Sequence, residues 1–151
     1  MSWLAQDWAG KIEVSDAYER CILTAYAHRA DEDGEGCFLS VRSLAAYAAV
    51  EERSITRRLT AMRRRQVIGY GDQERAAYLP PHLRPTVYDL LIPYSWFSAA
   101  QLERVQQFRL ENGRPLLTPE DRPDIAPPPP KKKRADAGKP APQRRPLAAG
   151  S

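Results

Sequence analysis

The chain has 151 residues, of which 42% are hydrophobic, enough for one domain with a real core but not for two. Its net charge of +4 and its pI near 9.2 favour a polyanionic partner. No apolar run reaches the length of a membrane span and the N-terminus lacks the pattern of a signal peptide, so we expect a cytoplasmic protein. The two cysteines, Cys21 and Cys37, lie among apolar residues, and with only two histidines beside them we expect reduced thiols and no metal site.

The first part of the chain predicts two helical segments. Residues 1–14 carry Trp3 and Trp8, and we expect an N-terminal arm or short helix whose indoles pack on the domain. Asp16 and Glu19 then form a D-x-x-E start signal, related to the capping box, for a helix that ends near His28.

The acidic segment 31–36, DEDGEG, is predicted to be a turn. Its acids are spaced around a glycine as in a calcium loop, but Arg42 stands where the twelfth-position glutamate would be required. Cys37 and Phe38 follow as a short strand.

Residues 40–68 predict two helices joined by a short turn at 49–51. Ser40 is the expected N-cap of the first helix. At helical spacing, one side of the second helix is formed by Ile55, Leu59, Met62 and Gln66, and the opposite side by Arg53, Arg57, Thr60 and Arg64. A tight helix pair with a basic second helix is typical of the helix-turn-helix arrangement that enters a DNA major groove.

An arginine-rich helix can also be a merely solvated surface. Here the acidic residues stand only at the helix start, Glu51 and Glu52, so the arginines would be unpaired within the helix. Phosphates neutralise such a row, and arginine also forms paired hydrogen bonds with guanine, so DNA accounts for the pattern better than solvation does.

Beyond the basic helix, 67–70 and 86–92 are expected to be strands, separated by a long proline-rich loop at 72–85. Helix, strand, helix, helix, strand, loop and strand is the order of a winged helix, with the loop as the wing. We expect its cations, Arg75, His82 and Arg84, to contact a narrow minor groove. The alternative is that the loop packs on a following helix through Tyr78 and Leu79.

Several of these features together resemble the bacterial and phage winged helix-turn-helix proteins. The shared pieces are the opening MSW, ADEDGEG at 30–36, Ser40 with Leu44 and Ala45, and the pair Val67 and Ile68, and they cover about residues 1–92. The resemblance implies DNA binding, since this family includes transcription regulators and the DNA-binding parts of plasmid and phage replication initiators.

The chain departs from that family at two helix ends. Ala49 and Glu51 stand where glycine and a serine or threonine cap are usual, which predicts a remodelled turn. Gln66 replaces a capping glycine, which predicts a helix that ends less sharply or runs longer.

The C-terminal third is expected to add one helix and a tail. Ser98 and Gln101 form a capping box for a helix that ends at Asn112 and Gly113. Trp96 and Phe97 at its entrance either fold it back on the domain, as we expect, or form the seam of a homodimer. From residue 114 onward the proline-rich sequence predicts a disordered basic tail that contacts phosphate or serves solubility.

The sequence as a whole therefore predicts an α+β, mostly α, winged helix-turn-helix domain at 1–93, an additional helix at 94–113 and a disordered tail at 114–151. We expect sequence-specific binding of double-stranded DNA, as a nucleoid-associated transcription regulator without enzymatic activity, cofactor or membrane contact. A role in plasmid or phage replication or partition, or as a protein-interaction adaptor, is the alternative. The expected DNA-contacting residues are Ser40, Arg42, Arg53, Thr56, Arg57, Thr60, Arg63, Arg64, Arg65, Arg75, His82, Arg84, Lys131, Lys132, Lys133 and Arg134.

Overall fold

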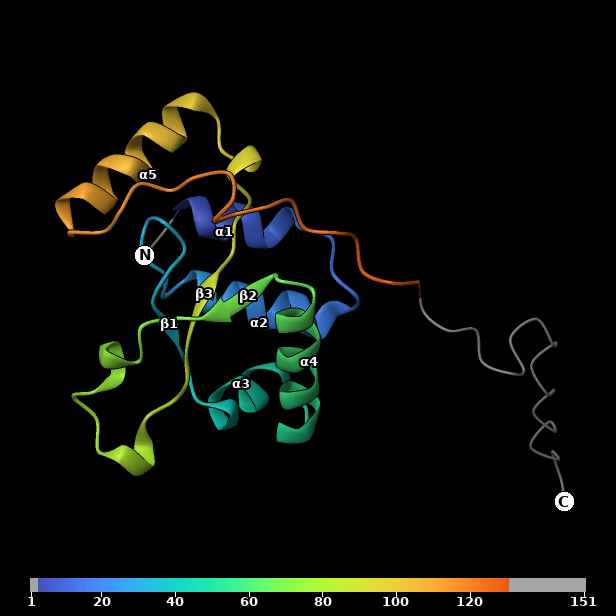
Figure 1. Cartoon of the computed structure of the whole chain (residues 1–151). Coiled ribbons are helices and arrows are strands. Elements are labelled where there is room, and N and C mark those ends of the chain that lie inside the picture. Colours follow the sequence, from blue (N-terminus) through green and yellow to red (C-terminus); the bar gives the residue numbers. More distant parts are fainter. Residues whose placement is uncertain (1–2, 131–151) are drawn as a thin grey trace, which may run out of the picture.

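The computed structural model describes residues 3–130, which form an α+β domain of five α-helices and a three-stranded antiparallel sheet (Figure 1). The helices are α1 (Trp3–Lys11), α2 (Ala17–Ala27), α3 (Val41–Ala48), α4 (Glu52–Arg64) and α5 (Ala99–Glu111). The strands are β1 (Cys37–Phe38), β2 (Ile68–Tyr70) and β3 (Val87–Leu90), in the order β1-β3-β2. Short 3₁₀ turns are η1 (Gln73–Ala76), η2 (Pro81–Leu83) and η3 (Tyr94–Trp96).

The sheet is small because its three strands have only two, three and four residues. In β1, Cys37 pairs with Tyr88 of β3, and in β2, Ile68 pairs with Leu90. The expected strands at 67–70 and 86–92 are thus confirmed with slightly shorter bounds.

Helix α2 is the centre of the core and contacts α1, α3, α4, β1 and β3. Its Ile22, Leu23 and Tyr26 are fully buried. Asp16 caps the helix by accepting a hydrogen bond from the Glu19 N–H, as the sequence predicts. The expected packing of both N-terminal indoles is half right, because Trp8 is buried whereas Trp3 is 80% exposed.

The chain forms the tight turn between α3 and α4 without a glycine. Ala49 adopts the left-handed conformation, with φ 55° and ψ 44°. The Val50 N–H donates to the Ala45 carbonyl at 3.0 Å and closes the end of α3. The expected remodelling is therefore wrong, since Ala49 takes the strained backbone conformation that glycine adopts without cost.

The end of α4 also has a residue other than glycine in the left-handed conformation. The helix stops at Arg64, and Gln66 takes a positive φ of 59°. The Val67 N–H donates to the Met62 carbonyl at 3.0 Å, and the Gln66 N–H donates to the Arg63 carbonyl at 3.0 Å. These two bonds form a Schellman motif, so the expectation of a less sharp or longer helix is wrong.

The C-terminal helix is folded back onto the domain. The Ser98 capping box is present, with the Gln101 N–H bonded to Ser98 Oγ and the Ser98 N–H bonded to Gln101 Oε1. Phe97 and Val105 join the common core, as expected for intramolecular packing.

The expected tail does not begin at residue 114. Leu117 is buried, and both its backbone N–H and its carbonyl are bonded to the Gln106 side chain at 2.8 Å. The Tyr94 N–H donates to the Arg122 carbonyl at 2.9 Å. In Figure 1 this segment runs back along α5 and across α1, so the prediction of disorder from residue 114 is wrong for this part of the chain.

A cluster of buried and half-buried charges connects this segment to the acidic turn. The charge cluster consists of Asp31, Asp33 and Glu35 with Arg109, Arg114 and Arg122. Asp33 is fully buried and accepts from Arg109 at 2.9 Å and from Arg114 at 2.7 Å. Arg122 donates to the Ile92 and Asp33 carbonyls at 3.1 and 3.0 Å. The acidic segment is therefore a turn, as predicted, and it also anchors the C-terminal segment.

Candidate nucleic-acid interface

Helix α4 has one packed face and one exposed basic face. Ile55, Leu59 and Met62 are buried, as the helical spacing predicts. Arg53, Thr56, Arg57 and Arg64 are exposed on the other side, while Thr60 is half-buried. Within residues 3–130, the guanidinium groups of Arg53, Arg57 and Arg64 have no hydrogen-bond or ion-pair partner, so three cations of this helix remain available to an external anion.

Two other arginines of the segment are bound to α2. Arg58 forms a 2.8 Å ion pair with Asp16 and lies over the Tyr18 ring at 4.6 Å. Arg65 forms a 2.8 Å ion pair with Glu19, and its side chain is only 12% exposed. The expectation that the arginine row is unpaired is therefore wrong at Arg58 and Arg65, and Arg65 fixes α4 on α2 rather than facing outward.

The pairing of Arg58 with Asp16 also affects the Asp16 carboxylate. Burial raises the pKa of Asp16, but the hydrogen bonds from Arg58 and from the Glu19 N–H outweigh it, and the net pKa is below the ordinary value. The Asp16 carboxylate that caps α2 thus stays ionised, and its charge binds Arg58 of α4.

Arg63 is held at the junction of α4 and the sheet. Its guanidinium lies over the Tyr70 ring at 4.9 Å, bonds the Tyr70 hydroxyl and reaches Thr60 Oγ1 at 3.3 Å. Tyr70 is in turn stacked on Tyr88 at 5.6 Å. Arg63 is therefore preorganised by an aromatic pair that sequence reasoning did not single out.

The N-terminus of α3 places two further predicted residues beside α4. Ser40 Oγ accepts from the Ser43 N–H at 3.0 Å, which confirms the predicted N-cap. The first turn of the helix carries Arg42, whose side chain is exposed.

Two of the three predicted cations of the loop after β2 are bound to other groups of the protein. Arg75 forms an ion pair with Asp31 and lies against Gly36, where an added Cβ would meet its guanidinium at 2.6 Å. Arg84 donates to the Leu79 and Ala77 carbonyls at 2.7 and 2.8 Å. His82 is exposed on η2.

The alternative prediction for this loop, that it packs on the following helix, is wrong. Tyr78 packs on Phe38 of β1 at a ring distance of 6.4 Å. Figure 1 shows α5 at the opposite end of the molecule from this loop, so Tyr78 and Leu79 do not carry the loop onto that helix.

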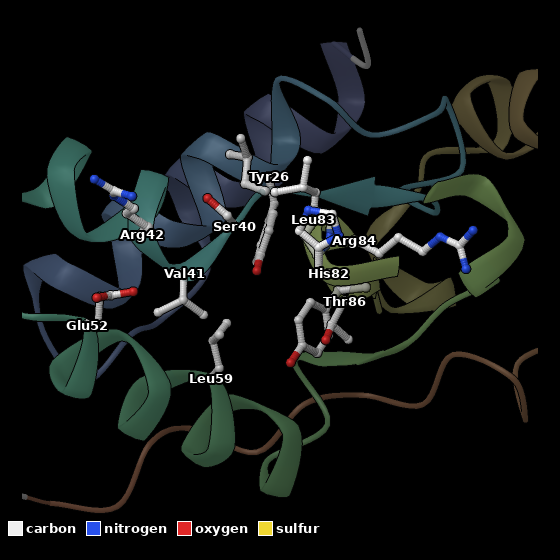
Figure 2. A pocket seen from close by; sticks show the side chains of 13 residues that line it. Tyr26, Ser40, Val41, Arg42, Glu52, Leu59, His82, Leu83, Arg84 and Thr86 are labelled. Atoms are coloured by element: carbon white, nitrogen blue, oxygen red, sulfur yellow. The ribbon is translucent and has the colours of Figure 1, made fainter. Parts of the chain in front are cut away.

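A cleft of about 500 Å³ separates the loop from the start of α3 and from α4. Its lining includes Ser40 and Arg42 from α3, Leu59 from α4, and His82 and Arg84 from the loop. The cleft thus brings together predicted residues from three segments (Figure 2).

Tyr26 of α2 forms part of this cleft, although its helical spacing predicts only a core residue. The side chain is fully buried, and its hydroxyl has no hydrogen-bond partner. Figure 2 shows the hydroxyl directed into the cleft. Burial, with the nearby Tyr88, raises the pKa of Tyr26 above its ordinary value, so the hydroxyl stays protonated.

The remaining predicted contacts, Lys131, Lys132, Lys133 and Arg134, lie outside the described residues. None of the helices within residues 3–130 has the length and apolar character of a membrane span.

Comparisons with protein-family models, with curated proteins and with solved structures gave no match.

Proposed function

We propose that the chain is a winged helix-turn-helix protein that binds double-stranded DNA sequence-specifically and acts as a transcription regulator. In this proposal α3 and α4 are the helix-turn-helix, α4 is the recognition helix and the loop between β2 and β3 is the wing. The element order α2, β1, α3, α4, β2, β3 and the tight left-handed turn at Ala49 are compatible with this assignment.

The observation that carries the proposal is the exposed face of α4. Arg53, Arg57 and Arg64 lack partners among residues 3–130, on a helix that Ile55 and Leu59 fix firmly to the core. A rigid helix with unpaired guanidinium groups suits a major groove, because arginine binds both phosphate and the guanine edge.

The two ends of α4 are assigned different roles. Arg53, Thr56 and Arg57 lie on its first turns, which reach base edges when the N-terminal part of a recognition helix enters the groove. Arg63 and Arg64 lie on its last turn, nearer to phosphate. Arg65 has no direct role here, because Glu19 holds it.

Binding of a random-sequence duplex at low salt, followed by fluorescence anisotropy, tests the proposal first. We expect binding that weakens steeply with salt, because phosphate contacts release counterions. Arg104 of α5 is exposed on another helix, so Arg104→Ala is the matched control and should leave affinity unchanged. A folded protein that fails to bind duplex would refute the proposal and favour the alternative of an adaptor with an acidic protein partner.

Sequence specificity requires a second comparison, on a site selected from a random pool. Arg57→Ala should cost about 1–3 kcal/mol on the selected site and relax its sequence preference. Arg64→Ala should weaken all duplexes alike and reduce the salt slope by about 0.9. If both variants lose affinity equally on every sequence, the assignment of base reading to the start of α4 is wrong.

A further inference from the structure

We propose that the cleft between α3, α4 and the loop binds a small aromatic carboxylic acid that carries a hydrogen-bond acceptor opposite its carboxylate. The acceptor would meet the Tyr26 hydroxyl, the ring would lie between the apolar walls, and the carboxylate would face the cations of the rim. This site goes beyond DNA binding and does not depend on it.

The unpartnered Tyr26 hydroxyl is the first observation. Tyrosine hydroxyl groups usually find a hydrogen-bond partner when they are buried, and one left without a partner destabilises the protein. Tyr26 is fully buried, yet its hydroxyl has no partner and is directed into the cleft (Figure 2). The Tyr88 ring packs at 5.7 Å and supplies no bond to the hydroxyl. A ligand acceptor that displaced the side chains covering this hydroxyl would complete the hydrogen bonding of the core.

The walls of the cleft favour a flat, apolar ligand. Val41 of α3 and Leu59 of α4 stand on one side, and Leu83 of η2 approaches from the loop (Figure 2). Leu83 is 58% exposed although it is a large apolar residue, and a ring in the cleft would cover it. A volume of about 500 Å³ lies within the ordinary range for small-molecule sites.

The rim favours an anion. Arg42, His82 and Arg84 line it together with a single carboxylate, that of Glu52. The Arg84 guanidinium is already fixed by two carbonyls of its own loop, at 2.7 and 2.8 Å. A preorganised guanidinium binds a carboxylate with less loss of side-chain freedom than a mobile one.

The test uses a hydroxynaphthoate whose hydroxyl and carboxylate lie at opposite ends of the ring system. Plain naphthoate lacks the acceptor, and the corresponding hydroxynaphthamide lacks the charge. Each is titrated into the full chain, and backbone amide chemical shifts report the affinity and the location. We expect the hydroxynaphthoate to shift amides around the cleft and to bind more tightly than either comparison compound.

The variant Tyr26→Phe tests the role of the hydroxyl directly. It should weaken hydroxynaphthoate about tenfold, the worth of one hydrogen bond, while naphthoate binds as before. Phenylalanine keeps the ring and removes the unpartnered group, so the variant should fold, with a Tm at least as high as that of the original chain.

The variant Leu83→Ala provides a second test of the site and leaves the core unchanged. It should weaken both naphthoates, whereas Leu110→Ala on α5, which is equally exposed at 58%, should change neither. The proposal is overturned if the hydroxynaphthoate leaves the cleft amides unshifted, if Tyr26→Phe affects both naphthoates alike or neither, or if the neutral amide binds as well as the acid. A failure of DNA binding would not affect any of these results.

Discussion

The charge cluster makes Asp33 the side chain whose loss should disturb the domain most. Its carboxylate is fully buried and accepts from Arg109, Arg114 and the Glu35 N–H. Asp33→Asn keeps the shape but removes the charge, and leaves two buried or half-buried guanidinium groups short of an anion. Removing one partner of a buried ion pair costs about 3–5 kcal/mol, which gives the expected loss in the free energy of unfolding.

Urea denaturation measures this loss, and Asp7→Asn provides the control. Asp7 forms a 2.9 Å ion pair with Lys11 on the surface of α1, where such a pair is worth about 0–1 kcal/mol. The contrast between the two variants isolates the effect of burial from the effect of losing an aspartate charge.

Amide hydrogen exchange shows which part of the domain the Asp33→Asn substitution destabilises. The Tyr94 N–H is bonded to the Arg122 carbonyl and the Leu117 N–H to Gln106. Both amides should exchange much faster in Asp33→Asn, because the segment from residue 114 to 125 loses its anchor. A stability loss no larger than that of Asp7→Asn, with these two amides still protected, would refute the view that the cluster holds the segment in place.

Three further predictions concern pH, backbone strain and the loop. Burial and the adjacent carboxylate of the charge cluster raise the pKa of Glu35 from 4.5 to about 7. The stability that the protonated Glu35 side chain contributes is therefore full below about pH 4.5 and is lost as the pH rises through about 7. In Glu35→Gln the urea denaturation midpoint should change less with pH over that range; an unchanged pH dependence of the midpoint would contradict this. Ala49→Gly and Gln66→Gly should each stabilise the domain by about 1 kcal/mol in urea denaturation, since both residues have positive φ; a destabilising glycine would show that the turn is not left-handed. The double variant Arg75→Ala, Arg84→Ala should speed exchange of the loop amides, because both side chains bind the protein itself. Any loss of DNA affinity should then come from the loosened loop and be equal on A·T-flanked and G·C-flanked duplexes; a loss confined to the A·T-flanked duplex would instead place the loop in a minor groove.

Short-range patterns in the sequence were sufficient for most of the secondary structure. The caps at Asp16, Ser40 and Ser98 each depend on a side chain and a backbone N–H three residues apart, so local spacing encodes them. The packed face of α4 follows from helical periodicity in the same way. These features need no knowledge of the rest of the fold.

The same local rules failed where packing overrode a backbone preference. Glycine is favoured at positive φ, which predicted a different turn and a longer helix where alanine and glutamine occur. Ala49 and Gln66 nevertheless take this conformation. Burial of Leu44, Ile55 and Met62 on either side outweighs a strain of about 1 kcal/mol at each site.

The candidate site was predictable only in part, because exposure of an arginine depends on elements far away in the chain. Arg57 and Arg58 are neighbours in the sequence, yet Arg57 is exposed, whereas Arg58 is bound to Asp16, 42 residues earlier. Helical spacing places Arg57 opposite the packed face of α4 and Arg58 at the edge of that face. It does not show that Asp16 is the partner of Arg58, because only the packing of α2 against α4 brings that carboxylate within reach.

The C-terminal segment shows the same limit at a larger separation. Its proline-rich composition predicted disorder, since it contains too few apolar residues to bury. Arg109 and Arg114 nevertheless meet Asp33 across 76 and 81 residues of sequence. The sequence by itself determined the helices, their caps and the basic face of α4, all of which depend on neighbours within one or two turns. Only the tertiary structure decided which charges are paired and that the Tyr26 hydroxyl faces a cleft, because a buried charge or hydroxyl is satisfied by whatever group the fold brings to it.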